Sequence, residues 1–553
     1  MRTVQRGHDT SLMAGLVTLL AALLVLLVLN APSRLDDLGP RTLLRLPLEA
    51  LVLFGLVVAL PSGRHGARRT LALAAGIALG LTAVFRLLDL GFTQALGRPF
   101  DPLVDWRYAS SLVELMRDSL GDRPGTALLV VAAASAVALL VLVSLAVLRL
   151  TRVASRHRRP VAQGVGVLTV VWVVLALLGT GGGGGALAAR DTAGYVYGQV
   201  SRIPDERRDL REFGAAAETD PLDEMSGQGL LTGLRGKDVL FVFVESLGRV
   251  ALEDSSLAPG VTEVLASGTR RLERSGFSSR SAWLTSPTFG GISWLAHATL
   301  QSGLWVDSQQ RYDELLASPR LTLTRLFARA GWRTVFDVPA NTRDWPEGSF
   351  YGFDQLYDSR NVGYEGPRFG YATMPDQFTL AAFHRLELVP SPRRPVMAEI
   401  DLVSSHVPWS RTPWMIDWSE VGDGSEYDDM RAELPSKSEV WTSPERIRDA
   451  YVESVAYSLT ALLEFVVRYG DDDLVVVFLG DHQPATVVSG SDAGWDVPIA
   501  VVARDPAVLD PVADWGWDPG LRPGPDAPTW RMDAFRDRFL AAYGPKGQSG
   551  PHG

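Results

Sequence analysis

Apolar residues crowd into the first third of the chain, where long uncharged runs alternate with short polar segments. Each run approaches the roughly 20 residues with which a helix crosses a bilayer. The five runs are residues 11–30, 43–60, 71–88, 126–148 and 161–178. Soluble proteins rarely bury five such helices in succession. The pattern therefore predicts a transmembrane bundle over residues 1–180 and a polar linker over residues 181–236.

Two arginine-rich loops predict the orientation of this bundle. The loop after the second run contains Arg64, Arg68 and Arg69 without an acid, and the loop after the fourth run contains five more arginines. Loops of this kind stay in the cytoplasm. Five crossings from a cytoplasmic N-terminus place the rest of the chain outside. A signal peptide is the alternative for the first run, but no small-residue cleavage site follows it. We expect a multi-pass protein of the cytoplasmic (plasma) membrane with an extracellular domain.

From about residue 237 the hydrophobic pattern changes to short β-rich runs that alternate with helical stretches. This alternation predicts an α/β fold with a largely parallel central sheet and flanking helices over residues 237–545, followed by a tail over residues 546–553. The runs that predict strands are residues 239–244, 334–338, 396–403, 474–479 and 499–502. In such folds ligands bind beyond the carboxyl ends of the strands.

Charge and cysteine content restrict the chemistry. The net charge of -10 provides no basic surface for a phosphate backbone, so nucleic acid is not an expected partner. The chain contains no cysteine, which excludes disulfides and thiolate metal sites. Oxygen atoms and imidazoles remain as strong metal ligands.

Three predicted strands end in residues that can bind metals or phosphate. Glu245 follows the first strand, and Asp481 and His482 follow a glycine at the end of another. His406 lies in a polar turn after a third strand. Taken singly, each has an ordinary structural explanation, such as an exposed strand end, an Asx turn or a structural histidine. Together they indicate a metal site, and an Asp-His pair directly after a buried strand is a moderately specific signal for one.

A hydroxyl nucleophile is predicted in the segment after residue 285. Ser293 follows the pair Gly290 and Gly291 and lies at an expected helix start, where backbone N–H groups favour a phosphate. Ordinary N-capping is the alternative role of Ser293. Thr288 is a second candidate for the nucleophile.

Together these residues resemble the lipoteichoic acid synthase branch of the alkaline phosphatase and sulfatase superfamily, over nearly the whole chain. In that family five transmembrane helices precede an extracellular sulfatase-like domain. The resemblance implies one divalent metal, usually manganese with magnesium or zinc as alternatives, on Glu245, Ser293, Asp481 and His482. It also implies that His406, in Ser-His-Val-Pro-Trp, holds the substrate phosphate.

Two departures from the family pattern concern the nucleophile and the substrate. Serine replaces the usual threonine at Ser293, and Arg343 and Trp345 match the head-group-binding arginine and tryptophan only loosely. A sulfatase of the formylglycine type would need a Cys or Ser in C/S-x-P-x-R. Residues 285–289, Thr-Ser-Pro-Thr-Phe, do not supply that pattern.

The sequence thus predicts a membrane-anchored, metal-dependent phosphoryl-type hydrolase or transferase. Its substrate would be a membrane lipid head group or an envelope polymer, attacked through a phosphoserine at Ser293. His406 and Arg343 would stabilise the developing negative charge. The alternatives are a sulfuric ester hydrolase and a non-catalytic envelope protein that keeps the fold. A transporter is disfavoured because the apolar runs contain no acid or histidine away from their ends. The oligomeric state is not indicated.

Overall fold

The computed structural model describes residues 2–32, 39, 45–61, 63–102, 104–109, 113, 122–178, 188–189 and 191–545. These residues divide into two compact units. The first comprises Met1–Thr93 and Arg98–Asp209, and the second comprises Gln94–Gly97 and Leu210–Gly553. Part of the predicted linker and the predicted tail lie outside the described residues.

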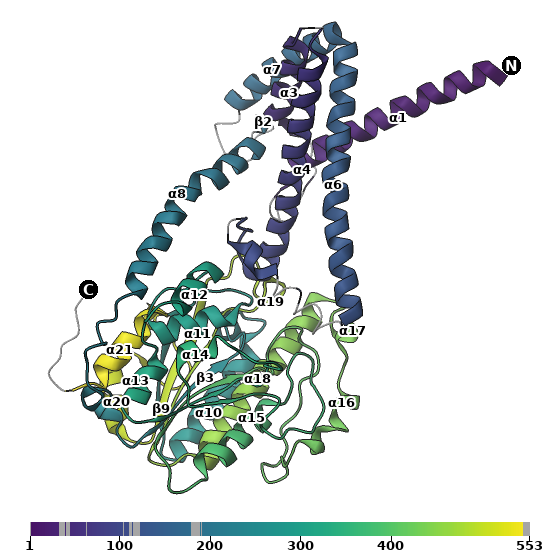
Figure 1. Ribbon diagram of the computed structural model, residues 1–553. Coiled ribbons are helices and arrows are strands. Elements are labelled where there is room, and N and C mark those ends of the chain that lie inside the picture. The colour runs from purple at the N-terminus through teal and green to yellow at the C-terminus, as the bar shows by residue number, and fades with distance from the viewer. Residues whose placement is uncertain are drawn as a thin grey trace. The chain divides into compact units, whose positions relative to one another are not determined.

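The first unit is built from long helices; four of the five predicted apolar runs lie wholly in one of them, whereas the run over residues 43–60 extends beyond α3 (Figure 1). The helices are α1 (Arg2–Asn30), α3 (Leu48–Ala59), α4 (His65–Leu96), α6 (Asp122–Arg156), α7 (Arg158–Leu178) and α8 (Asp191–Ala217). By length and composition α1, α4, α6 and α7 can cross a membrane. With 12 residues, α3 rises only about 18 Å, so within the described residues the second crossing is shorter than predicted.

Apolar side chains point outward from these helices. Leu23 of α1, Leu142 of α6 and Val170 of α7 are all more than half exposed, and α7 has no buried residue. An apolar surface of this extent is unfavourable in water and matches a hydrocarbon environment. The first unit therefore has the surface of a membrane protein.

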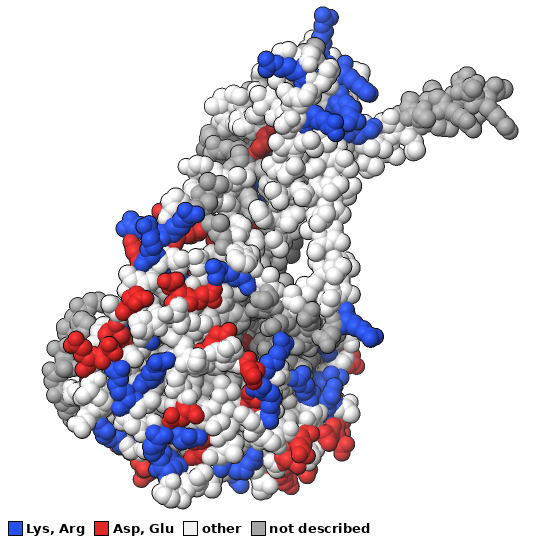
Figure 2. All heavy atoms as spheres, in the orientation of Figure 1, with Lys and Arg blue, Asp and Glu red and all other residues white. Residues whose placement is uncertain are grey.

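The two arginine-rich loops lie together at one end of the first unit. Arg158, the first residue of α7, donates a hydrogen bond to the carbonyl oxygen of Leu60 at 2.6 Å. Figure 2 shows basic side chains gathered at this end, with few acidic ones. Both loops therefore belong to one side of the bundle. The side of the membrane that they face remains a prediction.

The second unit contains a nine-stranded mixed sheet. The strands β8, β3, β7, β5 and β6 are parallel neighbours, whereas β9 is antiparallel to β8 and to β4. Along the sheet the order is β10 (Asp518–Pro519), β4 (Ser278–Thr285), β9 (Asp496–Ala503), β8 (Leu474–Gly480), β3 (Asp238–Val244), β7 (Val396–Leu402), β5 (Arg333–Asp337) and β6 (Gln355–Tyr357), with β11 (Thr529–Arg531) beside β4. All five predicted strands form, and the predicted α/β class with a mostly parallel sheet is confirmed.

Helices cover both faces of the sheet. Alternate residues of β3 enter two different cores, because successive side chains of a strand point to opposite faces. One core contains α10 (Ala258–Arg274) and α18 (Pro444–Tyr469), and the other contains α13 (Leu323–Arg329) and α21 (Ala534–Ala542). The other helices of at least seven residues are α11 (Ser293–Ser302), α12 (Gln309–Leu316), α15 (Asp376–Phe383) and α20 (Pro506–Ala513).

The helix α18 is apolar and long enough to cross a membrane, yet it belongs to this core. Its most apolar window is 67% buried, and it packs against α10 and α15. Because β3, β7 and β8 are parallel, their carboxyl ends lie side by side at the same end of the sheet. The residues singled out from the sequence follow these strand ends.

Candidate metal and nucleophile site

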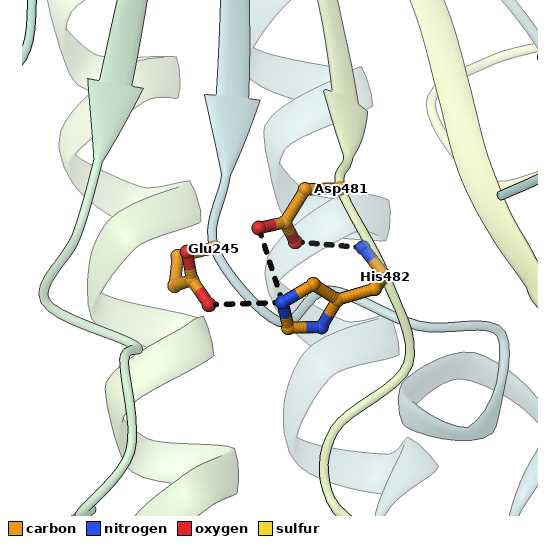
Figure 3. Close-up of side chains that lie close together, drawn as sticks. All are labelled: Glu245, Asp481 and His482. Atoms are coloured by element: carbon orange, nitrogen blue, oxygen red, sulfur yellow. Dashed lines mark hydrogen bonds and ion pairs between the residues drawn. The ribbon is translucent and has the colours of Figure 1, made fainter. Parts of the chain in front are cut away.

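Two neighbouring parallel strands bring Glu245, Asp481 and His482 together. Val244 of β3 pairs with Gly480 of β8, so the residues that follow both strands leave the sheet side by side. Figure 3 shows the three side chains pointing toward one another. His482 Nε2 lies 3.3 Å from Glu245 Oε1 and 3.5 Å from Asp481 Oδ2.

The turn after β8 depends on Gly480 and on one oxygen of Asp481. A Cβ atom at Gly480 would lie 1.9 Å from the carbonyl oxygen of Leu247. Asp481 Oδ1 accepts the backbone N–H groups of Ser246 and His482, each at 2.7 Å. These bonds join the two strand-end turns and leave Asp481 Oδ2 buried without a hydrogen-bond partner.

The imidazole of His482 is oriented by its other nitrogen. Nδ1 lies 2.8 Å from the carbonyl oxygen of Gln483, so Nδ1 carries the proton that it donates there. The opposite nitrogen, Nε2, is buried and makes no hydrogen bond. In the neutral imidazole, Nε2 therefore presents its lone pair to the two carboxylates.

The predicted nucleophile Ser293 reaches the same site. It is the first residue of α11, and its hydroxyl donates a hydrogen bond to Glu245 Oε2 at 3.2 Å. Ile292, directly before it, adopts a left-handed conformation with φ 65°, and Ser246, directly after Glu245, has φ 58°. Such conformations cost about 1–3 kcal/mol each and cluster at functional sites.

Burial and mutual charge shift the pKa values of these groups. Burial raises the pKa of Asp481 to about 7, with a further contribution from the charge of Glu245. Burial acts to raise the pKa of Glu245, but the neighbouring imidazoles of His406 and His482 outweigh it and hold this pKa well below the usual range. Burial acts to lower the pKa of His482, yet Asp481 and Glu245 outweigh it and raise the value to about 9.

The donor set fits a divalent metal ion. Glu245, Asp481 and His482 each offer one ligand atom, and these atoms lie within 4.8 Å of one another. Two of them, Asp481 Oδ2 and His482 Nε2, are buried without hydrogen-bond partners, which is unfavourable unless a cation satisfies them. Two carboxylates, an imidazole and a hydroxyl suit manganese, zinc or magnesium.

The turn after β7 brings His406 to this edge. The Ser405 hydroxyl donates to the backbone oxygen of Glu245 at 2.6 Å, which ties the two turns together. The His406 ring stacks on Tyr371 with 3.6 Å between ring centroids, and Nδ1 donates to the Val407 carbonyl. Burial lowers the pKa of His406, although the charge of Glu245 acts in the opposite direction.

The other predicted residues lie in different surroundings. Arg343 is exposed in the loop after β5, and Trp345 packs against Phe336 and Tyr351. Their predicted role in head-group binding remains a prediction. Thr288 is 4% exposed, and its Oγ1 has no hydrogen-bond partner, so of the two candidate nucleophiles Ser293 is the one in contact with Glu245.

Two contributors to the site were not expected from the sequence. Ser246 donates its hydroxyl to Glu245 Oε1 at 3.0 Å, and its position beside Glu245 was an available signal. Tyr371 stacks on His406 from a segment 35 residues earlier, and no local pattern marks it.

No family model and no curated protein matches the chain. Solved structures do resemble it. A lipoteichoic acid synthase from Listeria monocytogenes is 16% identical and has a TM-score of 0.39; the match covers 62% of this chain and 78% of that one. Structures of the branch named from the motifs are thus among those to which the chain is similar.

Two transferases are also similar. A phosphoglycerol transferase from Streptococcus pyogenes is 13% identical with a TM-score of 0.33, over 54% of this chain and 75% of its own. A lipooligosaccharide phosphoethanolamine transferase from Neisseria meningitidis is 12% identical with a TM-score of 0.37; the match covers 57% of this chain and 92% of that one. At such identities and TM-scores, the chemistry of this chain has to be inferred from its own residues.

Proposed function

We propose that this protein is a membrane-anchored, metal-dependent hydrolase or transferase that moves a phosphoryl-type group through a covalent intermediate on Ser293. One observation carries the proposal: the Ser293 hydroxyl contacts Glu245 at 3.2 Å, within the donor set of Glu245, Asp481 and His482. A hydroxyl, a helix N-terminus and a cation site at one strand edge provide a nucleophile and a phosphate-binding environment.

Glu245, Asp481, His482 and the Ser293 hydroxyl would hold the metal. When bound, a divalent ion would lower the pKa of the hydroxyl and polarise a phosphoryl oxygen. The Ser293 hydroxyl loses its proton and its Oγ forms a bond to phosphorus, while the bond from phosphorus to the leaving alkoxide breaks and that alkoxide takes up a proton. Water or an acceptor hydroxyl then loses its proton and attacks phosphorus; the bond from phosphorus to Ser293 Oγ breaks, and Oγ takes up a proton.

Two features of the chain stabilise negative charge on the transferred group. The N–H groups at the start of α11 have no side-chain cap and favour an anion beside Ser293. His406 adds positive charge when Nε2 is protonated, because Nδ1 is already committed to the Val407 carbonyl. A phosphate dianion near Nε2 would favour that protonated form. Arg343, exposed in the loop after β5, would bind the head group.

The apolar surface of the first unit supports a substrate at the membrane. Helices that expose leucine and valine over their length suit a bilayer. The proposed substrate is a lipid head group or an envelope polymer outside the cytoplasmic membrane. A sulfate ester is the alternative, because it has the same shape and would need the same donors.

The test is to trap the group on Ser293. The full chain in detergent, supplied with Mn²⁺, is incubated with a membrane lipid extract and digested with trypsin. Cleavage releases residues 281–311 as one peptide that contains both Thr288 and Ser293. Fragmentation of this peptide should locate an added mass on Ser293, and that mass identifies the transferred head group.

Two variants complete the test. Ser293→Ala should abolish the adduct and lower turnover roughly 10³-fold or more, as loss of a nucleophile does. Thr288→Ala, a matched loss of a nearby hydroxyl, should retain both the adduct and the wild-type turnover. An adduct on Thr288, or unchanged turnover in Ser293→Ala, would contradict the assignment of the nucleophile. Absence of both adduct and bound metal would favour the non-catalytic alternative.

A further inference from the structure

A second set of metal-ligand atoms lies between β7 and α11. Glu399 and Asp401 are two residues apart on β7, so their side chains point to the same face of the sheet. His297 comes one helical turn after Ser293 in α11. Its Nδ1 lies 2.7 Å from Glu399 Oε1 and 3.7 Å from Asp401 Oδ1. The three ligand atoms all lie within 4.8 Å of one another.

Two residues of this cluster are buried, Asp401 is partly buried, and further hydrogen bonds hold the cluster in place. Glu399 is 2% exposed and His297 is 8% exposed, with the imidazole stacked on Phe243 at 3.8 Å. Gln301 donates its amide to the other oxygen of Glu399, and the Gln301 oxygen is fixed by the N–H and hydroxyl of Thr324, each at 3.0 Å. Outer hydrogen bonds of this kind orient the ligands of metal sites.

The two carboxylates of the cluster share one imidazole. Among the described residues, His297 is the ion-pair partner of both Glu399 and Asp401, so when both carboxylates are ionised even a protonated imidazole leaves one negative charge in excess. Asp401 Oδ1 is buried without a hydrogen bond, and both carboxylate oxygens of Asp337 at the end of β5 are in the same condition. Unpaired buried carboxylates are costly, and a divalent ion would offset them.

Burial and mutual charge shift the pKa values of the cluster. Burial acts to lower the pKa of His297, but Asp401 and Glu399 raise it to about 9. Burial also raises the pKa of Asp401 to about 8, although His297 acts against this.

We propose that His297, Glu399 and Asp401 form a second divalent-cation site, distinct from that of Glu245, Asp481 and His482. One imidazole nitrogen and two carboxylate oxygens suit a transition-metal ion such as Zn²⁺ or Mn²⁺. Such an ion would tie α11 to β7. It would thereby fix the helix whose first residue is Ser293, one turn before His297. The proposal goes beyond the proposed function, because it concerns metal binding and not the reaction.

The test is metal stoichiometry in the full chain purified in detergent. Metal is removed with a chelator, the protein is equilibrated by dialysis against Zn²⁺ alone, and bound zinc is measured by mass spectrometry. Wild type should bind two equivalents, and Asp401→Asn should bind one. Asp376→Asn, which changes another buried aspartate outside both clusters, is the matched control and should keep two.

The variant Asp481→Asn separates this inference from the proposed function. It should also reduce zinc to one equivalent, and the double variant with Asp401→Asn should bind none. A single equivalent in wild type that survives Asp401→Asn but not Asp481→Asn would overturn the second site and leave the first. A single equivalent lost only in Asp401→Asn would instead overturn the metal site of the proposed function.

A second measurement does not depend on how Asp401→Asn folds. Crystals of the wild-type chain equilibrated with Zn²⁺, with data collected at the zinc absorption edge, should show an anomalous peak beside His297 Nδ1 and a separate one beside His482 Nε2. A map with a peak beside His482 alone would overturn the second site.

Discussion

At the scale of single residues, the two carboxylate oxygens of Asp481 have different roles. Oδ1 accepts two backbone N–H groups and holds the turns after β3 and β8 together. Oδ2 is buried, makes no hydrogen bond and lies 3.5 Å from His482 Nε2 within the donor set. The same division is seen at His482, where Nδ1 binds a carbonyl and Nε2 remains for a ligand. The fold itself therefore positions the ligand atoms.

Metal affinity should rise with pH. His482 has its pKa raised to about 9 and Asp481 to about 7, and both bind a metal only after losing their protons. Below these values protons compete with the metal. We expect the apparent Kd for Mn²⁺ to fall up to about tenfold per pH unit for each proton displaced, between about pH 6 and pH 9.

Equilibrium dialysis of the full chain at several pH values measures this dependence. The variant Asp401→Asn removes the second cluster from the measurement, so that its slope reports Glu245, Asp481 and His482. An affinity that does not change with pH would show that these groups are not the ligands.

The sequence predicted Glu245, Ser293, Asp481 and His482, and the structure brings these four together. They could be found because each stands directly after a strand or at a helix start, which local hydrophobic patterns reveal. The Tyr371 ring against His406 could not be found, since it depends on how two distant segments fold. The second cluster left only a weak signal, two acids in an otherwise apolar strand.

At the scale of elements, apolar runs predicted five strands but not the pairing of β9 or the existence of β4. The strand β4 begins with Ser-Ser-Arg-Ser and lacks the continuous apolar run of β3 and β8. Its antiparallel pairing with β9 is set by tertiary contacts, which local composition does not encode. The parallel centre of the sheet, where the site lies, was the predictable part.

The turn after β8 should tolerate no side chain at Gly480. A Cβ atom there would lie 1.9 Å from the Leu247 carbonyl oxygen, which is backbone and cannot rotate away. Gly480→Ala should therefore push apart the turns after β3 and β8. We expect a loss of about 1–3 kcal/mol in the free energy of unfolding, together with weaker metal binding.

Thermal unfolding with and without Mn²⁺ measures both effects. The control is Gly494→Ala in the exposed loop before β9, where a Cβ atom would meet nothing within 4 Å. It should unfold and bind metal as wild type does. Equal behaviour of the two variants would show that the close approach at Gly480 does not set the turn.

At the scale of the whole molecule, hydropathy and burial separate two kinds of apolar helix. The helices α6 and α18 are both long and apolar, but the most apolar window is 6% buried in α6 and 67% buried in α18. The hydropathy of the same windows also differs, at 2.8 in α6 and 1.4 in α18. The five runs predicted from the sequence accordingly leave out residues 444–469, and the packing of α18 against the sheet and its neighbours agrees with this.

The predicted orientation can be tested with single cysteines, because the chain has none of its own. Gly63 is exposed in the loop between α3 and α4, and Gly494 is exposed in the second unit. The sample is cells whose outer envelope layers have been removed and whose cytoplasmic membrane is sealed. A membrane-impermeant maleimide should label Gly494→Cys in these cells. It should label Gly63→Cys only after the membrane is opened, because the arginine-rich loop stays in the cytoplasm. The cysteine-free parent gives no background signal. Labelling of Gly63→Cys in sealed cells, or protection of Gly494→Cys, would invert the topology and place the candidate site beyond the reach of an external envelope substrate.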